Sequence, residues 1–180
     1  MALDSDNVRV AVTGAVYVAP AGTTGPNYSD DALDAAFVDL GYVSSDGVAE
    51  SIDRSTTQIR SWQDGSLVRE ITSEGTFSVS MTFIETNEKV VELYYGSALS
   101  TGKLDIDPRS SGGRKSFVVD VVDGTKIERT YIPAGEVTSI GERTLASGEA
   151  IGYEVTITAY ADAGSTTVSK FFSDFGSVEP

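Results

Sequence analysis

The sequence predicts a mainly β protein: a β-sandwich or open barrel of about seven to eight strands, with one α-helix packed on the outside. Three observations lead to this prediction. Short runs of alternating apolar and polar residues recur along the chain. Turn-forming Asp-Gly pairs at 64–65 and 123–124 join such runs into hairpins. A helical spacing of apolar residues occurs in one segment, at 90–95.

The first element is a predicted strand over residues 8–18, followed by a surface connection over 19–37 that is rich in Gly, Pro, Ser and Asp. The valines of this strand share one face: Val8, Val10, Val12, Val16 and Val18. Residues 49–73 are predicted to form a hairpin with Asp64-Gly65 at its tip in a tight type I′ turn. The apolar residues of this hairpin do not alternate regularly. We therefore expect it to project from the body and to need a partner.

The next segment, "TFSVSMTFIETNEKVVELYYG" at 76–96, changes its period halfway along. Its first half is a strand with one hydroxyl face and one apolar face. The apolar residues are predicted to point into the core: Phe77, Val79, Met81 and Phe83. Its second half is a helix over about 87–95, with Thr86 as the N-cap, Glu88 in the first turn and Gly96 at the end. The apolar stripe of this helix is predicted to pack on a sheet.

The remaining elements follow a predicted loop over 97–114. Residues 115–133 are predicted to form a second hairpin that turns at Asp123-Gly124. The segments "AGEVTSIGERT" and "IGYEVTITAYAD" each predict one more strand, and in the last strand Val155 and Ile157 point into the core. Three phenylalanines of the tail have no regular context, and they either pack on a neighbouring copy or close the core: Phe171, Phe172 and Phe175.

Composition excludes several classes of function. The 180 residues are enough for one domain with a real core, and 13 basic against 27 acidic residues give a net charge of -14. Because nucleic-acid binders cluster Lys and Arg, this chain is not expected to grip DNA, although it can lie close to it. No apolar run is long enough to span a membrane, and the acidic amino terminus lacks a signal core. The absence of cysteine fits folding in the cytosol.

No catalytic, cofactor or metal site is predicted. The chain has no histidine and no G-x-S-x-G motif. The segment "SSGGRKS" at 110–116 breaks the Gly-Lys-Ser order of a phosphate loop and precedes a strand. The acidic runs "DSDN" at 4–7 and "DIDP" at 105–108 do not continue into a calcium-binding loop.

Five pieces of the sequence carry a resemblance to a known family. They are "VTGAVYVAPAGTTGP" (12–26), "FVDLGYVSSDGV" (37–48), "STTQIRSWQDGSLVRE" (55–70), "TFSVSMTFIETNEKVVELYYG" (76–96) and "AYAD" (159–162). In this order they resemble the major tail tube protein of long-tailed, non-contractile phages (siphophages), especially those infecting actinobacteria. Larger relatives carry a further immunoglobulin-like domain at the carboxyl end. This chain is expected to be a single tail tube domain over 1–180 without one.

The resemblance implies a structural virion protein that is made in the host cytoplasm and has no enzymatic activity, cofactor or membrane contact. Copies would form hexameric rings that stack into a tube, and each copy would add a few strands to a closed inner barrel. Genomic DNA would pass through this conduit without specific binding. Expected partners are other copies, the tail tape measure protein, the tail terminator and the distal tail protein.

Two sets of residues acquire expected roles from the resemblance. The candidates for the lumen are Thr76, Ser78, Ser80, Thr82, Glu154, Thr156 and Thr158. The candidates for ring stacking are Arg54, Arg60, Trp62, Asp64 and Arg69. In this interpretation the hairpin is a basic arm that meets the acidic rim of the next ring, with Trp62 as an anchor. The alternative is a solvated hairpin with Trp62 folded back onto its own domain.

Other functions remain open at this point. A tube protein of a contractile phage, a phage-like bacteriocin or a type VI secretion system would share the fold. A β-sandwich that binds carbohydrate would favour a flat row of exposed aromatic side chains and a signal peptide. A hydrolase that uses paired acids would need an acid pair within a motif, and the sequence shows none.

Overall fold

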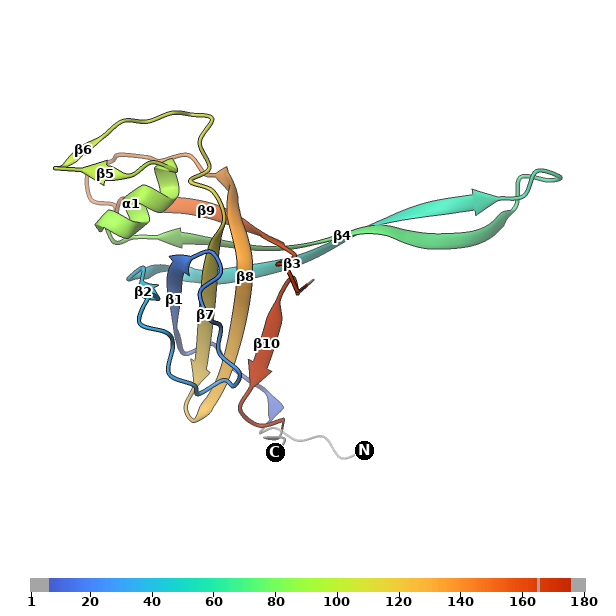
Figure 1. Ribbon diagram of the computed structural model, residues 1–180, viewed down its shortest axis with the longest axis horizontal. Helices are drawn as coiled ribbons and strands as arrows, with labels where there is room; N and C mark the ends of the chain where they lie inside the picture. Colours follow the sequence, from blue (N-terminus) through green and yellow to red (C-terminus); the bar gives the residue numbers. More distant parts are fainter. Residues whose placement is uncertain (1–6, 165, 176–180) are drawn as a thin grey trace.

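The computed structural model describes residues 7–164 and 166–175 (Figure 1). One eight-stranded antiparallel sheet has the order β2-β1-β7-β8-β9-β4-β3, with β10 paired to β8. Its strands are β1 (Thr13–Pro20), β2 (Val38–Asp39), β3 (Val43–Arg60), β4 (Leu67–Phe83), β7 (Lys115–Asp123), β8 (Lys126–Ile140), β9 (Tyr153–Tyr160) and β10 (Ser169–Phe172). A small second sheet joins β5 (Leu99–Ser100) to β6 (Lys103–Leu104). The described residues contain one helix, α1 (Glu88–Tyr95), so the predicted fold class is confirmed.

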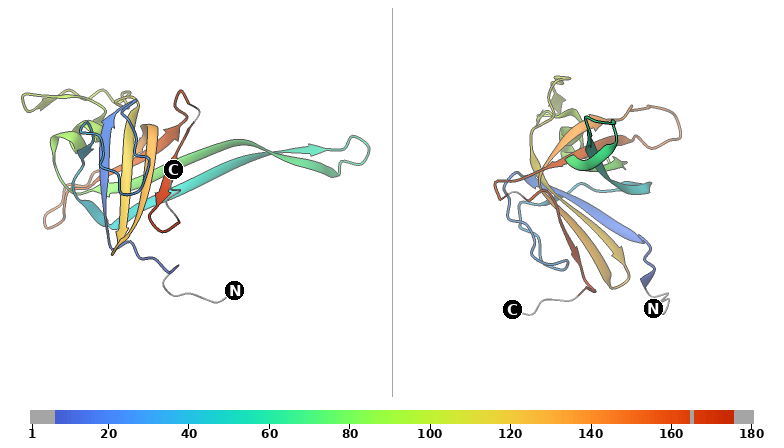
Figure 2. Two further views of the ribbon diagram at one scale, coloured as in Figure 1. Left: turned by 60° about the horizontal axis from the view of Figure 1, so that its bottom comes forward. Right: turned by 90° about the vertical axis from the view of Figure 1, so that its right-hand side faces the viewer.

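The long strand β8 turns this sheet into two layers. Its first half pairs with β7 and β10, and its second half, from Ala134 to Ile140, pairs with β9. As a result β1, β7 and β10 run nearly across the direction of β3, β4 and β9 (Figure 1, Figure 2). The core fills the space between the layers and under α1. Its buried residues are Val16, Val18, Leu40, Val79, Met81, Phe83, Val90, Leu93, Tyr94, Phe117, Val119, Ile132, Val137, Tyr153, Val155, Ile157 and Ala159.

Helix α1 packs against β8 and β9. Its apolar side chains Val90, Leu93 and Tyr94 are buried there, and it ends at Gly96, whose φ of 62° is left-handed, as predicted. The predicted N-cap Thr86 is wrong. Asn87 caps the helix, because its side-chain oxygen accepts a hydrogen bond from the Val90 amide at 2.9 Å.

The hairpin β3–β4 differs from its prediction at the tip. Asp64 and Gly65 lie within a six-residue connection, 61–66, and not in a two-residue turn. A type I′ turn needs positive φ at both central residues, and only Gly65 has it, at 71°. The Ser66 amide donates to the Asp64 carboxylate at 3.1 Å, and the Ser61 amide donates to the Ser66 carbonyl at 2.8 Å. These bonds stabilise the wider connection.

Other elements also differ from the sequence predictions, and β4 joins the second strand of the predicted hairpin to the predicted strand at 76–83 without a break. Strand β1 begins at Thr13, so Val8, Val10 and Val12 precede it and are exposed. The predicted strand "AGEVTSIGERT" is the second half of β8, which continues from the second hairpin without a break. Phe171 and Phe172 belong to β10, and the predicted loop 97–114 contains β5 and β6. No helix of the described chain is both long and apolar enough to span a membrane.

Candidate functional site

The lumen candidates lie on one face of two neighbouring strands. Register pairs Ser78 with Thr158, Ser80 with Thr156, and Thr82 with Glu154. Because side chains alternate along a strand, the intervening residues of β4 and β9 point to the opposite, buried face under α1. The structure therefore brings the predicted hydroxyl and acidic side chains together on the sheet face that is turned away from the helix.

This polar face extends onto strands that the sequence interpretation did not include. On β3, Ser51 pairs with Ser78 and Asp53 pairs with Thr76. On β8, Glu136 pairs with Thr158, and the Thr138 and Thr158 hydroxyl oxygens lie 2.7 Å apart. Polar residues alternate along "ESIDRS" at 50–55, which could have indicated a polar face on β3. The residues between them are exposed and not regularly apolar, so the pattern is weak. Four strands, β3-β4-β9-β8, thus form one continuous polar surface.

Both sides of this four-stranded unit lack a strand partner in the described chain. Strand β3 stands at the end of the sheet and pairs with β4 alone. Strand β7 pairs with β8 only as far as Gly135, so residues 136–140 have no strand partner on that side. An unpaired edge exposes a row of backbone donors and acceptors that can pair with another chain.

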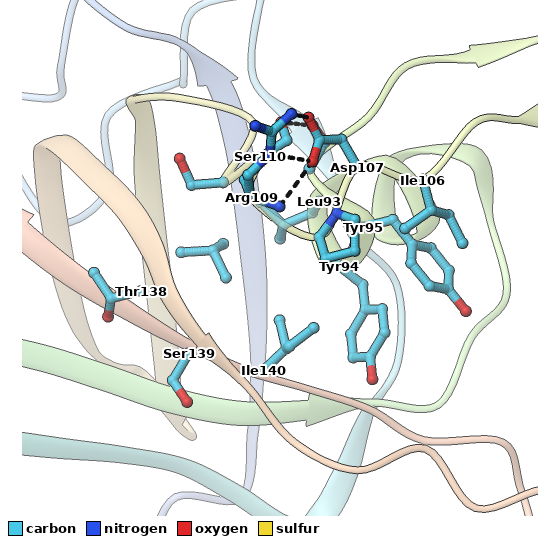
Figure 3. Close-up of a pocket in the computed structure, with 14 residues that line it drawn as sticks. Leu93, Tyr94, Tyr95, Ile106, Asp107, Arg109, Ser110, Thr138, Ser139 and Ile140 are labelled. Carbon is cyan, nitrogen blue, oxygen red and sulfur yellow. Dashed lines mark hydrogen bonds and ion pairs between the residues drawn. The ribbon is translucent and has the colours of Figure 1, made fainter.

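A groove runs beside the free edge of β8. It has a volume of about 410 Å³ and lies between residues 137–140 and the end of α1 with the loop that follows. Figure 3 shows Thr138, Ser139 and Ile140 on one side and Tyr94, Tyr95 and Ile106 on the other. The edge is thus open to an incoming strand.

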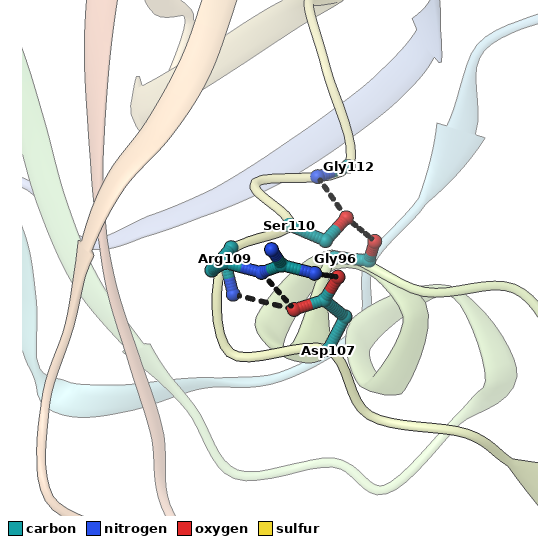
Figure 4. Close-up of polar contacts among 5 residues, drawn as sticks. All are labelled: Gly96, Asp107, Arg109, Ser110 and Gly112. Atoms are coloured by element: carbon teal, nitrogen blue, oxygen red, sulfur yellow. Dashed lines mark hydrogen bonds and ion pairs between the residues drawn. The ribbon is translucent and has the colours of Figure 1, made fainter.

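The loop beyond the groove is held against the end of α1. The Ser110 hydroxyl donates to the Gly96 carbonyl at 2.5 Å, and the Arg109 guanidinium donates to the Asp107 carboxylate at 3.0 Å (Figure 4). The bond from Arg109 lowers the pKa of Asp107 below its usual value. These contacts fix one wall of the groove.

The hairpin extends far beyond the body (Figure 1). Residues 67–76 of β4 pair only with β3, and every residue from 49 to 75 of the two strands is exposed. At about 3.3 Å per residue this overhang is roughly 30 Å long. The Trp62 side chain is 95% exposed.

Of the charged ring-stacking candidates, Arg60, Asp64 and Arg69 lie near this tip, whereas Arg54 pairs with Gly75 farther along the hairpin. Arg54 and Arg60 lie on one side of β3, whereas Arg69 pairs with Ile59 on the other. The Arg60 guanidinium donates to the Gln58 side chain at 2.8 Å. Hydrogen bonds from Ser61 and then Ser66 lower the pKa of Asp64 to about 2, so its carboxylate stays charged at neutral pH. Positive charge is therefore presented on both faces of the hairpin.

The described residues include no cluster of side chains that could hold a metal ion. No group of three potential metal ligands occurs in that part of the chain, which includes the run at 105–108. Most of the run at 4–7 lies outside the described residues. What the described residues offer instead are surfaces for association: a polar sheet face, two free sheet edges and a long exposed hairpin.

Such a combination defines a self-associating structural protein. The chain belongs to the phage tail tube protein family, whose model matches residues 1–176. It is therefore a non-enzymatic structural component of a virion tail that assembles into a tube. A search of curated protein sequences found no significant match.

Solved structures with a similar fold come from a phage-like system. One is a chain of the PVC sheath-tube complex of an extracellular contractile injection system in the extended state, with 9% identity and a TM-score of 0.53 over 92% of this chain and 93% of that chain. Another belongs to the PVC sheath/tube terminator of the same kind of system, with 10% identity and a TM-score of 0.50 over 93% and 99%. At these identities the likeness concerns the fold.

Proposed function

We propose that six copies of this chain close into a ring, and that the rings stack into the tail tube of a long-tailed, non-contractile phage. The polar face of β3-β4-β9-β8 would line the bore through which DNA leaves the capsid. The single observation that carries this proposal is the four-stranded polar surface with a free edge on each side. A surface of this kind can be continued by identical neighbours.

Strand direction supports closure into a ring. Neighbouring strands of β3-β4-β9-β8 are antiparallel, so β3 and β8 at the two sides run in opposite directions. The free side of β8 in one copy can therefore pair antiparallel with β3 of the next, and the groove beside residues 137–140 leaves room for it. Six copies with four strands each give a barrel of about 24 strands, wider than the porins that already hold an aqueous channel.

The chemistry of the polar face suits passage of DNA without binding. Among its described positions are hydroxyl side chains and three carboxylates, Asp53, Glu136 and Glu154, and the register places no Lys or Arg among them. Six chains carry 6 × -14 = -84 formal charges per ring. Phosphates would feel the carboxylates within about 8 Å at physiological salt, and no fixed cation would hold them.

The hairpin is proposed as the contact between rings. Its length of roughly 30 Å lets it cross a ring boundary, and its exposed Trp62 and arginines need a partner surface. Head-to-tail contacts of this type do not close on themselves, so the tube needs other proteins to set its length and to finish its ends. The tape measure, terminator and distal tail proteins are the expected partners in these roles.

Electron microscopy of the concentrated protein tests the proposal. We expect six-fold rings and tubes with a central bore, and antibody against the protein should label the tails of virions along their length. A reconstruction that placed residues 76–82 against apolar neighbours, away from a bore, would contradict the lumen assignment. The same images decide between siphophage and contractile systems, because a contractile tail would show a sheath around the tube.

A further inference from the structure

Exposed apolar side chains gather at two opposite ends of the β3-β4-β9-β8 unit. One group lies on the hairpin: Ile52, Ile59, Trp62, Leu67, Val68 and Ile71. The second group, called here the rim, consists of Tyr42, Ile84, Ile140, Leu145 and Ile151. Eleven of the 18 large apolar residues that are exposed in the described chain fall into these two groups. Patches of this kind mark interaction surfaces.

The rim stands at the end of the sheet where all four strands begin or end. Register aligns Val43 with Phe83, Phe83 with Tyr153, and Ile140 with Val155. The rim residues flank these positions in the adjoining segments. The hairpin leaves the sheet at the other end, so the segments that carry the two apolar groups lie at opposite ends of the sheet (Figure 1, Figure 2).

Internal contacts hold the rim in place. In the loop 141–152, the Arg143 guanidinium donates to the Tyr95 hydroxyl at 3.0 Å and to the Tyr153 hydroxyl at 3.3 Å. Where β3 begins and β4 ends, the Ile84 amide donates to the Tyr42 carbonyl at 2.9 Å. A surface that is already ordered loses little entropy when a partner binds.

The formal charge of the segments that form the rim is opposite to the formal charge of the outer part of the hairpin. The rim segments 39–42, 84–85 and 140–151 contain four acids (Asp39, Glu85, Glu142 and Glu149) and one arginine, which gives a formal charge of -3. The outer part of the hairpin, from 54 to 69, contains three arginines and one aspartate, which gives +2, whereas the flanking acids Glu50, Asp53, Glu70 and Glu74 bring the whole exposed stretch 49–75 to -2. Complementary charge favours the pairing of these two surfaces and disfavours contact between like ends.

We infer that the rim is the surface that receives the hairpin of a copy in the adjacent ring. This inference rests on the proposed stacking of rings and adds the identity of the receiving surface. The occupant is a second copy of this chain. The outer part of its hairpin supplies apolar side chains that can pack on the apolar rim and positive charge that can face the acidic rim segments. The contact is head-to-tail, so every ring has one hairpin end and one rim end.

A substitution in the rim tests the inference. Leu145 is 68% exposed, so Leu145→Asp should leave the fold unchanged but place a further negative charge and its hydration in the apolar contact. We expect the variant to lose tube formation, as seen by electron microscopy and sedimentation. Val8→Asp is the matched control: Val8 is 72% exposed before β1, outside both the rim and the groove beside β8, and its variant should form tubes like the unmodified chain.

Mixing two blocked variants identifies the partner surface. A Trp62→Ala, Ile59→Asp variant has a damaged hairpin and an intact rim, and Leu145→Asp has the reverse. Each should stop growth alone, whereas the mixture retains one working contact and should give particles of twice the mass of the unit that either variant forms alone. Mass photometry measures this doubling.

The outcomes separate the inference from the proposed function. Normal tubes from Leu145→Asp, or no doubling in the mixture, would overturn the role of the rim while the unmodified chain still formed tubes. Absence of rings and tubes from the unmodified chain at every concentration would instead overturn the proposed function.

Discussion

At the scale of single residues, a nearly buried ion pair joins Arg129 of β8 to Asp120, its register partner on β7. The Arg129 guanidinium donates to both carboxylate oxygens of Asp120 at 2.7 and 2.8 Å and to the Asp31 carbonyl at 2.7 Å. The bond with Asp120 raises the pKa of Arg129 above its usual value. One side chain thereby joins β7, β8 and the long connection 21–37.

Arg129→Met should destabilise the fold because it leaves the Asp120 carboxylate nearly buried without its partner. The expected loss in the free energy of unfolding is about 3–5 kcal/mol, measured by urea denaturation. Adding Asp120→Leu should restore part of that loss. Arg109→Ala removes an exposed ion pair with Asp107 and should change nothing measurable. Equal stability of Arg129→Met and the unmodified chain would show that this pair does not stabilise the contact of β7 and β8 with the connection 21–37.

Also at the residue scale, Asn87 links the start of α1 to the body. Its side-chain oxygen accepts from the Val90 amide, and its side-chain nitrogen donates to the Leu40 carbonyl at 2.9 Å. Asn87→Ala should therefore lower the free energy of unfolding by about 1–2 kcal/mol and speed hydrogen exchange of the Val90 amide. Thr86→Ala is the control, because the Thr86 hydroxyl lies 3.2 Å from the Tyr153 hydroxyl and does not cap the helix. Faster exchange at Val90 in Thr86→Ala alone would contradict this assignment.

At the scale of elements, the sequence was most informative where one face of an element is buried. The alternation in 76–83 and 153–160 predicted the second half of β4 and the whole of β9 with the correct inward residues, because burial selects apolar side chains at every second position. The helix was predicted by its spacing, but its N-cap was assigned to Thr86, whereas Asn87 accepts the capping bond from Val90 and also donates to the Leu40 carbonyl. Prediction was weakest for β3 and the first part of β4, whose exposed faces impose no pattern.

The sequence of the hairpin is not constrained by a core, because every residue from 49 to 75 of its two strands is exposed. Since Trp62 is 95% exposed, Trp62→Ala should leave the free energy of unfolding within about 0.5 kcal/mol of the unmodified value. We expect it to prevent tube formation in sedimentation assays, because the aromatic anchor of the contact between rings is lost. Tyr28→Ala, an exposed aromatic on the connection 21–37, is the control and should assemble normally. Normal tubes from Trp62→Ala would refute the anchor role.

At the scale of the whole molecule, the sequence predicted a protein that associates, but the geometry of association depends on the fold. The free edge of β8 was hidden in the sequence because "AGEVTSIGERT" read as a separate strand, whereas it continues the strand that pairs with β7. Likewise the segments that carry Ile84 and Ile151 come to the same end of the sheet only through the pairing of β4 with β9, in which Phe83 pairs with Tyr153. Long-range register of this kind has no local signature in one sequence.

The polar face carries the last prediction, which concerns DNA in the assembled tube. Lysine at Ser78, Ser80 and Glu154 adds three positive charges per copy on the face proposed to line the bore and removes one negative charge, a net change of +4 that six copies repeat around each ring. Phosphates would then bind successive lysines and release counterions, so ejection from variant virions should slow, and added salt should reverse part of the effect. The control places lysine at Glu88, Ser100 and Thr101, which adds the same charge on and beside α1, away from that face. DNA release measured with a fluorescent dye should be slow only in the first variant. Unchanged ejection with intact tubes would mean that β4 and β9 do not face the DNA.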